Sequence, residues 1–385
     1  MKNILKVVFV IIGTLIGAGF ASGQEIYTFF FSHGIEGIYG IFISCILMGV
    51  ILYKALTKID KYNISTYKDF LDIIINQKKI TNNRLRNKDA EYKKNKYQKS
   101  TNAKFGKKEN ANIKNKKEKN LKTKNIEIIK EVINNIINIF ILVTFFIMIA
   151  GFGAYFEQEL GINNLIGSSI LAILCFIIFM SNVEGVIKAS ELLVPILIIF
   201  LIIVGVLNFN DIHFLNIQDY ISKTSYSNFI VDAVIYSSYN SILLIPVLIT
   251  LKNYLKDKKQ ILGISTITTV ITITLSMIIF LVLTRVDVDI TKLEMPVVYV
   301  VSHMAKFLRY IYGFIILGSI FTTAISLGVS FLQNMTKNKR SYTQLAFIMC
   351  ITSIIISNFG FSNLVNSLYP IFGGLGSIQI ILLLL

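Results

Sequence analysis

The stretch from Gly13 to Ile26, GTLIGAGFASGQEI, decides the fold of this chain. It lies within an apolar segment, from about Leu5 to Phe31, that is long enough to cross a bilayer. Yet it holds glycines, which cost roughly 1 kcal/mol each relative to alanine in a helix, and Glu25, a carboxylate that is expensive at membrane depth. A segment that served only as an anchor would need neither. We therefore predict an interrupted membrane helix of the kind that builds binding sites in transporters.

The composition around this stretch indicates a polytopic membrane protein. Of 385 residues, 54% are hydrophobic and 16% are charged, and the mean hydropathy is +0.65. Ordinary soluble domains carry about 25% charged residues, so this chain is too apolar to be one of them. Repeated apolar runs predict an all-α fold with about ten transmembrane helices. The predicted spans are about 5–31, 37–56, 128–154, 165–182, 192–207, 229–251, 261–284, 307–335, 342–357 and 365–384.

The net charge of +16 lies almost wholly in one segment. Between Lys58 and Lys130 there are 22 Lys and Arg residues but only 8 Asp and Glu residues. We predict that residues 60–127 form a basic, low-complexity loop, disordered or loosely helical, because this composition buries too little apolar surface to fold alone. The Lys and Asn bias is either a by-product of nucleotide composition or a tether to anionic lipids. Nucleic acid is not expected as a partner of a membrane chain with this charge distribution.

The positive charges also set an orientation. With the N-terminus in the cytoplasm, Lys2, the basic loop, Lys188, the cluster from Lys252 to Lys259 and the cluster from Lys337 to Arg340 all lie inside. The loop after the seventh span, with Arg285, is the exception. We expect a multi-pass protein of the cell membrane with its N-terminus and the 60–127 loop in the cytoplasm.

Ten spans divide into two halves, residues 1–207 and 229–385, within one transporter-like domain. Because each half has an odd number of spans, the halves are expected to be inverted relative to each other. The sixth span is polar at its centre, from Tyr236 to Ser241, so the first helix of each half is predicted to be interrupted. Matched breaks of this kind point to a transport site at the bilayer midplane, because lipid cannot satisfy the freed backbone groups.

The motif at Gly13–Ile26, the YNS of the sixth span, the VEG after the fourth and the FTT of the eighth resemble the YkvI-type membrane proteins. These are relatives of the amino acid–polyamine–organocation superfamily, which has the LeuT-like fold with a 5+5 inverted repeat. The resemblance covers the whole chain except the basic loop, which is longer than the family pattern.

The resemblance implies two sets of site residues. The first set, in the interrupted parts of spans one and six, would bind the substrate: Gly17, Ala18, Gly19, Ser22, Glu25, Tyr236, Ser237, Ser238, Tyr239 and Asn240. The second set would hold a sodium ion through hard oxygen ligands: Gly13, Ile16, Ser319, Thr322 and Thr323. A proton is the other coupling ion considered. No further metal and no cofactor is expected, since His33, His213 and His303 fall in loops or at span ends.

Several of these site residues also have an interpretation in which they serve only the structure. Gly17 and Gly19 would allow close helix packing, and the threonines would bond to carbonyls of their own helix. Glu25 would be a solvated helix end, or a buried carboxylate that binds a substrate amine or carries a proton. Glu157 and Glu159 are expected to be exposed loop acids.

The sequence thus predicts a secondary transporter of a small solute, such as an amino acid or an amine, that works by alternating access with sodium or proton coupling. No nucleotide-binding motif is present, and no constellation of an enzyme lies within the spans. The alternative is a membrane receptor or sensor that keeps the fold without transport. The long basic loop favours that alternative.

Overall fold

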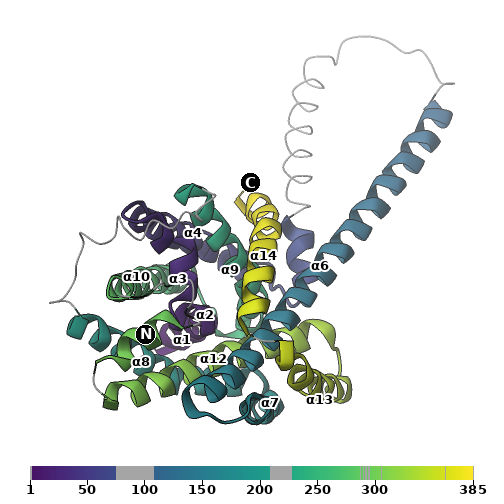
Figure 1. Ribbon diagram of the computed structural model, residues 1–385. Helices are drawn as coiled ribbons and strands as arrows, with labels where there is room; N and C mark the ends of the chain where they lie inside the picture. The colour runs from purple at the N-terminus through teal and green to yellow at the C-terminus, as the bar shows by residue number, and fades with distance from the viewer. Residues whose placement is uncertain are drawn as a thin grey trace.

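The computed structural model describes residues 2–74, 108–208, 228–286, 288, 290, 293, 295–304, 306–359 and 361–384, and within these ranges it contains helices but no strand. The chain is drawn in Figure 1. The α-helices are α1 (Lys2–Leu15), α2 (Ala18–Ala21), α3 (Gln24–Phe29), α4 (Glu36–Tyr62), α6 (Lys108–Leu160), α7 (Asn164–Met180), α8 (Asn182–Asn208), α9 (Phe229–Thr250), α10 (Lys258–Leu283), α11 (Pro296–Ser302), α12 (Lys306–Met335), α13 (Lys339–Ile356) and α14 (Phe361–Leu384).

Seven helices in the described ranges are long and apolar enough to cross a membrane, and two shorter apolar helices, Asn3–Leu15 and Asn164–Met180, accompany them. The seven lie within α4, α6, α8, α9, α10, α12 and α13. Together with α14, these elements match the predicted spans in order. The expectation of a polytopic, all-α membrane protein is confirmed.

Burial separates the central helices from the peripheral ones. In α9 and α12, 83% of the membrane-spanning window is buried, and in α6 the share is 78%, whereas it is 33% in α8 and 28% in α13. A helix that is apolar all round and also buried belongs to the centre of a bundle. Helices α7, α8 and α13 instead carry exposed Ile, Leu and Phe side chains, as a lipid-facing surface requires. The site must therefore be sought among α1, α6, α9 and α12.

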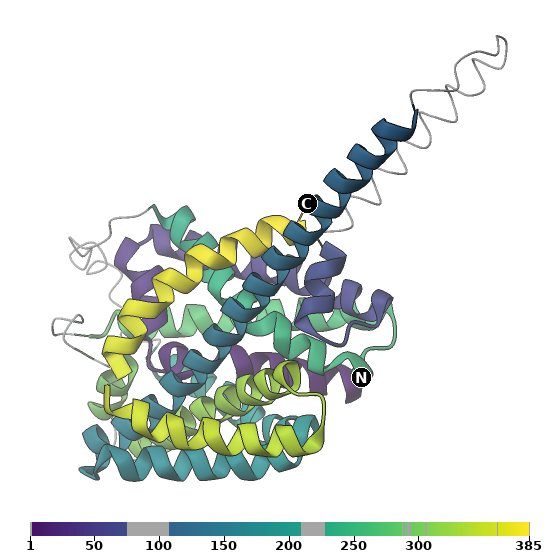
Figure 2. The same ribbon diagram turned by 90° about the vertical axis from the view of Figure 1, so that its right-hand side faces the viewer.

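Helix α6 is much longer than a membrane is thick. Its 53 residues correspond to about 80 Å at 1.5 Å per residue, whereas about 20 residues span the hydrocarbon core. It begins at Lys108, inside the segment that we predicted to be a basic loop. Figures 1 and 2 show this helix leaving the bundle at one end. Residues 75–107 of the same segment lie outside the described residues, as does the polar stretch 209–227 between the halves.

The prediction that the sixth span is interrupted is wrong. Helix α9 runs without a break from Phe229 to Thr250, and Tyr236–Ser241 lie in its interior. Their side chains return hydrogen bonds to the helix: the Ser237 hydroxyl donates to the Ala233 carbonyl at 2.7 Å, and the Asn240 amide donates to the Tyr236 carbonyl at 3.0 Å. Serine and asparagine bond to their own helix in this way within membranes, so polarity alone did not require unwinding.

The short helix after the seventh span, α11, packs into the bundle. The side chains of Val297, Val298, Val300 and Val301 are buried. The helix contacts α10 and α12. It therefore forms part of the packing around the broken first span.

Candidate functional site

The first span is interrupted, as the sequence predicts. Helix α1 ends at Leu15, Gly17 is extended with φ −86° and ψ −167°, and α2 begins at Ala18. The regular helix pattern resumes at once, because the Ala21 N–H donates to the Gly17 carbonyl at 2.9 Å. All of Gly17, Ala18 and Gly19 are buried. The break therefore lies inside the bundle, where lipid does not reach its backbone.

A second break follows at Gly23, which the sequence interpretation missed. Its φ of +85° lies in the left-handed region, where side chains other than glycine are strained. A Cβ atom there would also lie 2.6 Å from Cγ2 of Val297. The signal was the Ser-Gly pair directly after the apolar run, a common turn sequence. Three short helical pieces, α1, α2 and α3, thus replace one continuous span.

Two neighbouring elements hold α2 in place. The Val297 N–H of α11 donates to the Ser22 carbonyl at 3.0 Å, and the Tyr312 hydroxyl of α12 donates to the Ala21 carbonyl. The Ser22 hydroxyl itself donates to the Gly19 carbonyl at 3.2 Å. Ser22 is therefore used within the turn, and Tyr312 is a contact of the site that the sequence interpretation did not name.

The eighth span contacts the first at the break. The Thr323 hydroxyl on α12 donates to the Gly13 carbonyl at 2.8 Å and lies 3.3 Å from the Thr14 carbonyl. A Cβ atom on Gly13 would lie 3.2 Å from Cβ of Thr322, and one on Gly17 would lie 3.4 Å from the Thr323 side chain. Glycine at position 13 is thus what allows α12 to come this close to α1.

The other predicted cation ligands lie close by. The Thr322 hydroxyl donates to the Ser319 carbonyl at 3.0 Å, and the Ser319 hydroxyl donates to the Ile316 carbonyl at 2.8 Å. Ile16 is buried at the break itself. The structure therefore brings Gly13, Thr322 and Thr323 together, with Ser319 one turn away. Each hydroxyl oxygen keeps lone pairs after donating, so this set of neutral oxygens suits a small hard cation.

Glu25 lies on the other side of the break. Its side chain is 5% exposed, and it accepts a hydrogen bond from the Tyr239 hydroxyl of α9. Its Oε1 lies so close to Gly19 that a Cβ atom on that glycine would collide with it. Of its two interpretations, the solvated helix end is therefore wrong. Among the residues that the structure describes, no Lys, Arg or His forms an ion pair with this carboxyl group.

Aromatic rings pack around Tyr239, the residue that donates to Glu25. Phe29 stacks on Tyr239 with ring centroids 5.8 Å apart, and Tyr236 lies edge-on to Phe29, Phe30 and Tyr239 at 5.4, 4.9 and 5.5 Å. We call Phe29, Phe30, Tyr236 and Tyr239 the aromatic cluster. Within this cluster, Phe29 and Tyr236 both pack against Tyr239. The hydroxyl that contacts Glu25 is therefore held in place by a packed aromatic cluster.

The remaining predicted residues of the sixth span do not join Glu25. The Ser237 hydroxyl lies 3.0 Å from the Ser44 carbonyl of α4, and the backbone of Ser238 is approached closely by Gly376 of α14. Asn240 is buried and bonded to its own helix. Only Tyr236 and Tyr239 therefore reach the broken segment through contacts that the structure defines.

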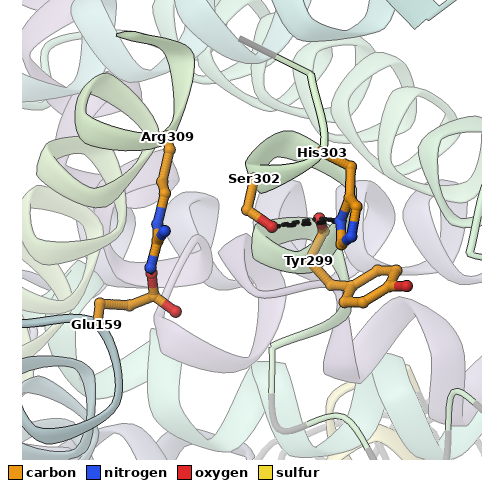
Figure 3. A network of polar contacts seen from close by, with 5 residues as sticks. All are labelled: Glu159, Tyr299, Ser302, His303 and Arg309. Carbon is orange, nitrogen blue, oxygen red and sulfur yellow. Dashed lines mark hydrogen bonds and ion pairs between the residues drawn. The ribbon is translucent and has the colours of Figure 1, made fainter. Parts of the chain in front are cut away.

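Polar pairs link the spans at the end of the bundle that holds α11. Figure 3 shows Arg309 of α12 directed at Glu159 of α6, and Ser302 of α11 directed at His303, which follows α11. Arg309 and Glu159 form an ion pair of 2.9 Å. A second pair joins η1 (Phe31–His33) to α9, with His33 2.7 Å from Asp232. Glu159 was expected to be an exposed loop acid, but it is helical and paired, whereas Glu157 is helical and exposed.

The described residues contain no group of three or more His, Cys, Asp or Glu side chains that could hold a metal ion. His213 lies outside the described residues. Cys45, Cys175 and Cys350 are each buried and free.

Comparison with known proteins agrees with this architecture. No family model matches the chain. The chain is 27% identical, over 379 residues, to the uncharacterized membrane protein YkvI of Bacillus subtilis (strain 168), an alignment that covers 96% of this chain and 91% of that protein. The resemblance to YkvI-type membrane proteins is thereby confirmed.

A solved structure shares the fold. A Na+-coupled sialic acid symporter, in a substrate-bound outward-open state, matches with a TM-score of 0.60 at 12% identity, over 97% of this chain and 76% of that one. At this identity the likeness concerns the fold alone, and it confirms the expected LeuT-like architecture. Neither similar protein is described as an enzyme.

Proposed function

We propose that this membrane protein is a secondary transporter that moves a small solute by alternating access, coupled to a sodium ion or a proton. The observation that carries the proposal is the buried break between α1 and α2. A broken helix inside a bundle leaves backbone groups that need a partner, and transporters use such groups to hold substrates and ions at the midplane. The LeuT-like fold supports the same conclusion.

The two sides of the break are chemically different, which suggests a division of roles. On the α12 side, the oxygens of Gly13, Thr322 and Thr323 would hold the cation. On the α9 side, Glu25 and Tyr239 would face the substrate. The backbone of Gly17, Ala18 and Gly19 lies between the two, so movement of this segment would couple one event to the other.

The surroundings of Glu25 favour a substrate that carries an amine. A single buried carboxyl group without a basic partner among the described residues is suited to a positive group by its charge. In this role an incoming ammonium group would displace the Tyr239 hydroxyl from Glu25. If the substrate carries no such group, Glu25 is the place where the protein would carry a coupled proton.

A thermal-stability screen tests this proposal. The purified protein is heated with a panel of amino acids, amines and organic cations, each with sodium chloride and with choline chloride. We expect at least one amine to raise the apparent melting temperature, and more so with sodium. The Gly19→Leu variant, in which the side chain fills the space beside Glu25, should not respond. Identical curves with every compound in both salts would contradict the proposal.

One observation favours the second candidate function, a sensor that binds without transport. Helix α6 is continuous from Lys108 to Met148, whose sulfur would lie 3.4 Å from a Cβ atom on Gly17. This distance along the helix is about 60 Å at 1.5 Å per residue. A rigid helix that connects the break to the basic segment could pass a signal to a cytoplasmic partner. Transport remains the better supported function, because the solved structure that shares the fold is a symporter.

The placement in the membrane completes the proposal. The chain is multi-pass, and we place the N-terminus and the basic segment 60–127 on the cytoplasmic side, since most Lys and Arg residues of the short loops then lie inside. The basic segment would there face anionic lipids. The halves 1–207 and 229–385 would move relative to each other during transport.

A further inference from the structure

An open cavity of about 550 Å³ lies at the end of the bundle opposite to α11, and the proposed transport cycle does not use it. It is lined by the end of α7, the end of α12 and the first turn of α13. Its size is within the range of pockets that hold small ligands. The residues that matter to the argument are Asn182, Gln333, Lys337, Lys339 and Tyr342.

The charge of this cavity is positive. Lys337 and Lys339 line it, and no acidic residue does. The ammonium group of Lys252 lies 2.5 Å from the hydroxyl of Ser65, another lining residue, so a third positive charge stands at the edge. Three ammonium groups around one cavity without a carboxylate create a field that attracts an anion.

The backbone and side chains of the cavity add hydrogen-bond donors. Helix α13, of 18 residues, begins here, and Asn338 caps it by accepting from the Ser341 N–H at 2.9 Å. The positive end of its dipole therefore adds to the lysines. The Tyr342 hydroxyl is buried and has no hydrogen-bond partner in the described part of the chain. A buried hydroxyl without a partner is costly, and a rotation of the Tyr342 side chain toward a ligand oxygen in the cavity would offset that cost.

The walls beside the cavity are apolar and face outward. Met180 at the end of α7 is 44% exposed, and Phe347 on α13 is 56% exposed. Helices α7 and α13 contact each other through Phe176 and Phe347, whose ring centroids are 6.1 Å apart. Figure 2 shows these two helices side by side at the edge of the bundle. A polar, basic cavity that opens beside a lipid-facing surface fits an amphipathic ligand.

We propose that this cavity binds the phosphate headgroup of an anionic phospholipid, with its acyl chains along α7 and α13. The lysines would pair with the phosphate, and Tyr342 would donate to one of its oxygens. Gln333 and Asn182, which bond to each other at 2.6 Å, form a neutral polar wall for the rest of the headgroup. Of the 60–127 segment, for which a tether to anionic lipids was considered, Ser65 lines this cavity, but Lys252, Lys337 and Lys339 lie outside that segment.

Native mass spectrometry of protein released from nanodiscs tests the site. The nanodiscs contain equal amounts of phosphatidylglycerol and phosphatidylcholine. For the parent protein we expect retention of phosphatidylglycerol over phosphatidylcholine, and a loss of about tenfold in the Lys337→Gln/Lys339→Gln variant, as the removal of a charge-assisted contact implies. The matched control is Lys258→Gln/Lys259→Gln, which removes two exposed lysines outside the cavity and should keep the preference.

A second variant guards against loss of fold. Tyr342→Phe keeps the ring and removes only the unpartnered hydroxyl, and it should weaken retention of phosphatidylglycerol without lowering the melting temperature measured without lipid. Equal retention by the parent and the cavity variants would overturn the proposal. So would stabilisation of the parent protein by inorganic phosphate that equals its stabilisation by short-chain phosphatidylglycerol, because the site would then be one for a free anion.

Discussion

The Thr323 hydroxyl donates a hydrogen bond of 2.8 Å to the main-chain carbonyl of Gly13, and so joins the eighth span to the first at the point where the first helix breaks. Residues 310 positions apart in the chain meet here because Gly13 has no side chain to keep α12 away. Both partners are buried. Two uncharged oxygens from different spans are thus held together in a place where a cation would connect the movement of the two spans.

Replacement of Thr323 by alanine tests the cation role. We expect Thr323→Ala to raise the sodium concentration that gives half-maximal thermal stabilisation by about tenfold or more. This corresponds to the loss of roughly 1.4 kcal/mol of sodium binding from one ligating hydroxyl. Thr323→Ser keeps the hydroxyl and should restore the sodium response. The measurement is substrate-induced thermal stabilisation as a function of sodium concentration.

The matched control is Ser326→Ala, one turn further along α12. The Ser326 hydroxyl is also buried, but it donates to the Thr322 carbonyl of its own helix at 2.7 Å. Its removal should leave the sodium response unchanged. If Thr323→Ala and Ser326→Ala behave alike, the cation assignment is wrong.

Glu25→Gln tests the acidic side of the site. Glutamine has the same size and can still accept from Tyr239, so the fold should be kept while the negative charge is lost. We expect binding of an amine substrate to weaken at least tenfold, because a charge-assisted contact becomes a neutral one. Isothermal titration in detergent measures this. Glu157→Gln, at an exposed position of α6, is the control and should bind as the parent does.

Gly19→Leu tests the space beside the break. Since even a Cβ atom would collide with Glu25, the larger side chain should abolish substrate binding while the protein still inserts. Gly318→Ala is the contrasting change, because a Cβ atom there meets only Leu193 at 4.0 Å. Alanine at that helical position should stabilise the protein by up to about 1 kcal/mol and leave binding intact. Equal binding by the parent and by Gly19→Leu would show that substrate does not approach this glycine.

Gly23→Ala tests the second break. Its φ of +85° costs alanine about 1–2 kcal/mol, and the collision with Val297 adds to that cost. We expect a lower apparent melting temperature, measured by the unfolding of purified protein. A Gly23→Ala/Val297→Ala double variant relieves the collision and should recover part of the loss.

Deletion of residues 82–122 separates the two candidate functions. A transporter should keep uptake after this deletion, because the removed part of α6 lies far from the break. A sensor that signals through α6 should keep ligand binding and lose its output to a cytoplasmic partner. If the deletion variant is correctly inserted but loses uptake, residues 82–122 are needed for transport, and this prediction is wrong.

Much of the fold follows from the sequence, because apolar length and charge placement act locally. Each span is recognisable from its own residues, and the break in the first span follows from glycines at positions where a membrane helix gains nothing from them. The same reasoning gave the wrong result for α9, because serine and asparagine satisfy their side chains on their own helix as readily as they mark an unwound segment.

The contacts between spans could not be predicted in this way. Tyr239, and not Ser237, faces Glu25 because of the way α9 is rotated about its axis. Helices α4 and α14 pack against other faces of α9, where they contact Ser237 and Ser238. Tyr312, which holds the end of α2, lies 291 residues away from its partner Ala21 and carries no local signal. The cavity at Lys337 and Lys339 likewise forms only where three helix ends meet.

In the proposed function, this protein moves a small solute against its gradient by using a cation gradient. The most direct test is uptake of labelled amino acids and amines into proteoliposomes, with an inward sodium gradient, with an inward proton gradient, and with neither. At least one solute should accumulate under one of the gradients, and this accumulation should be lost in Gly19→Leu. Uptake that is the same with and without both gradients, or that matches empty liposomes for every solute, would contradict it.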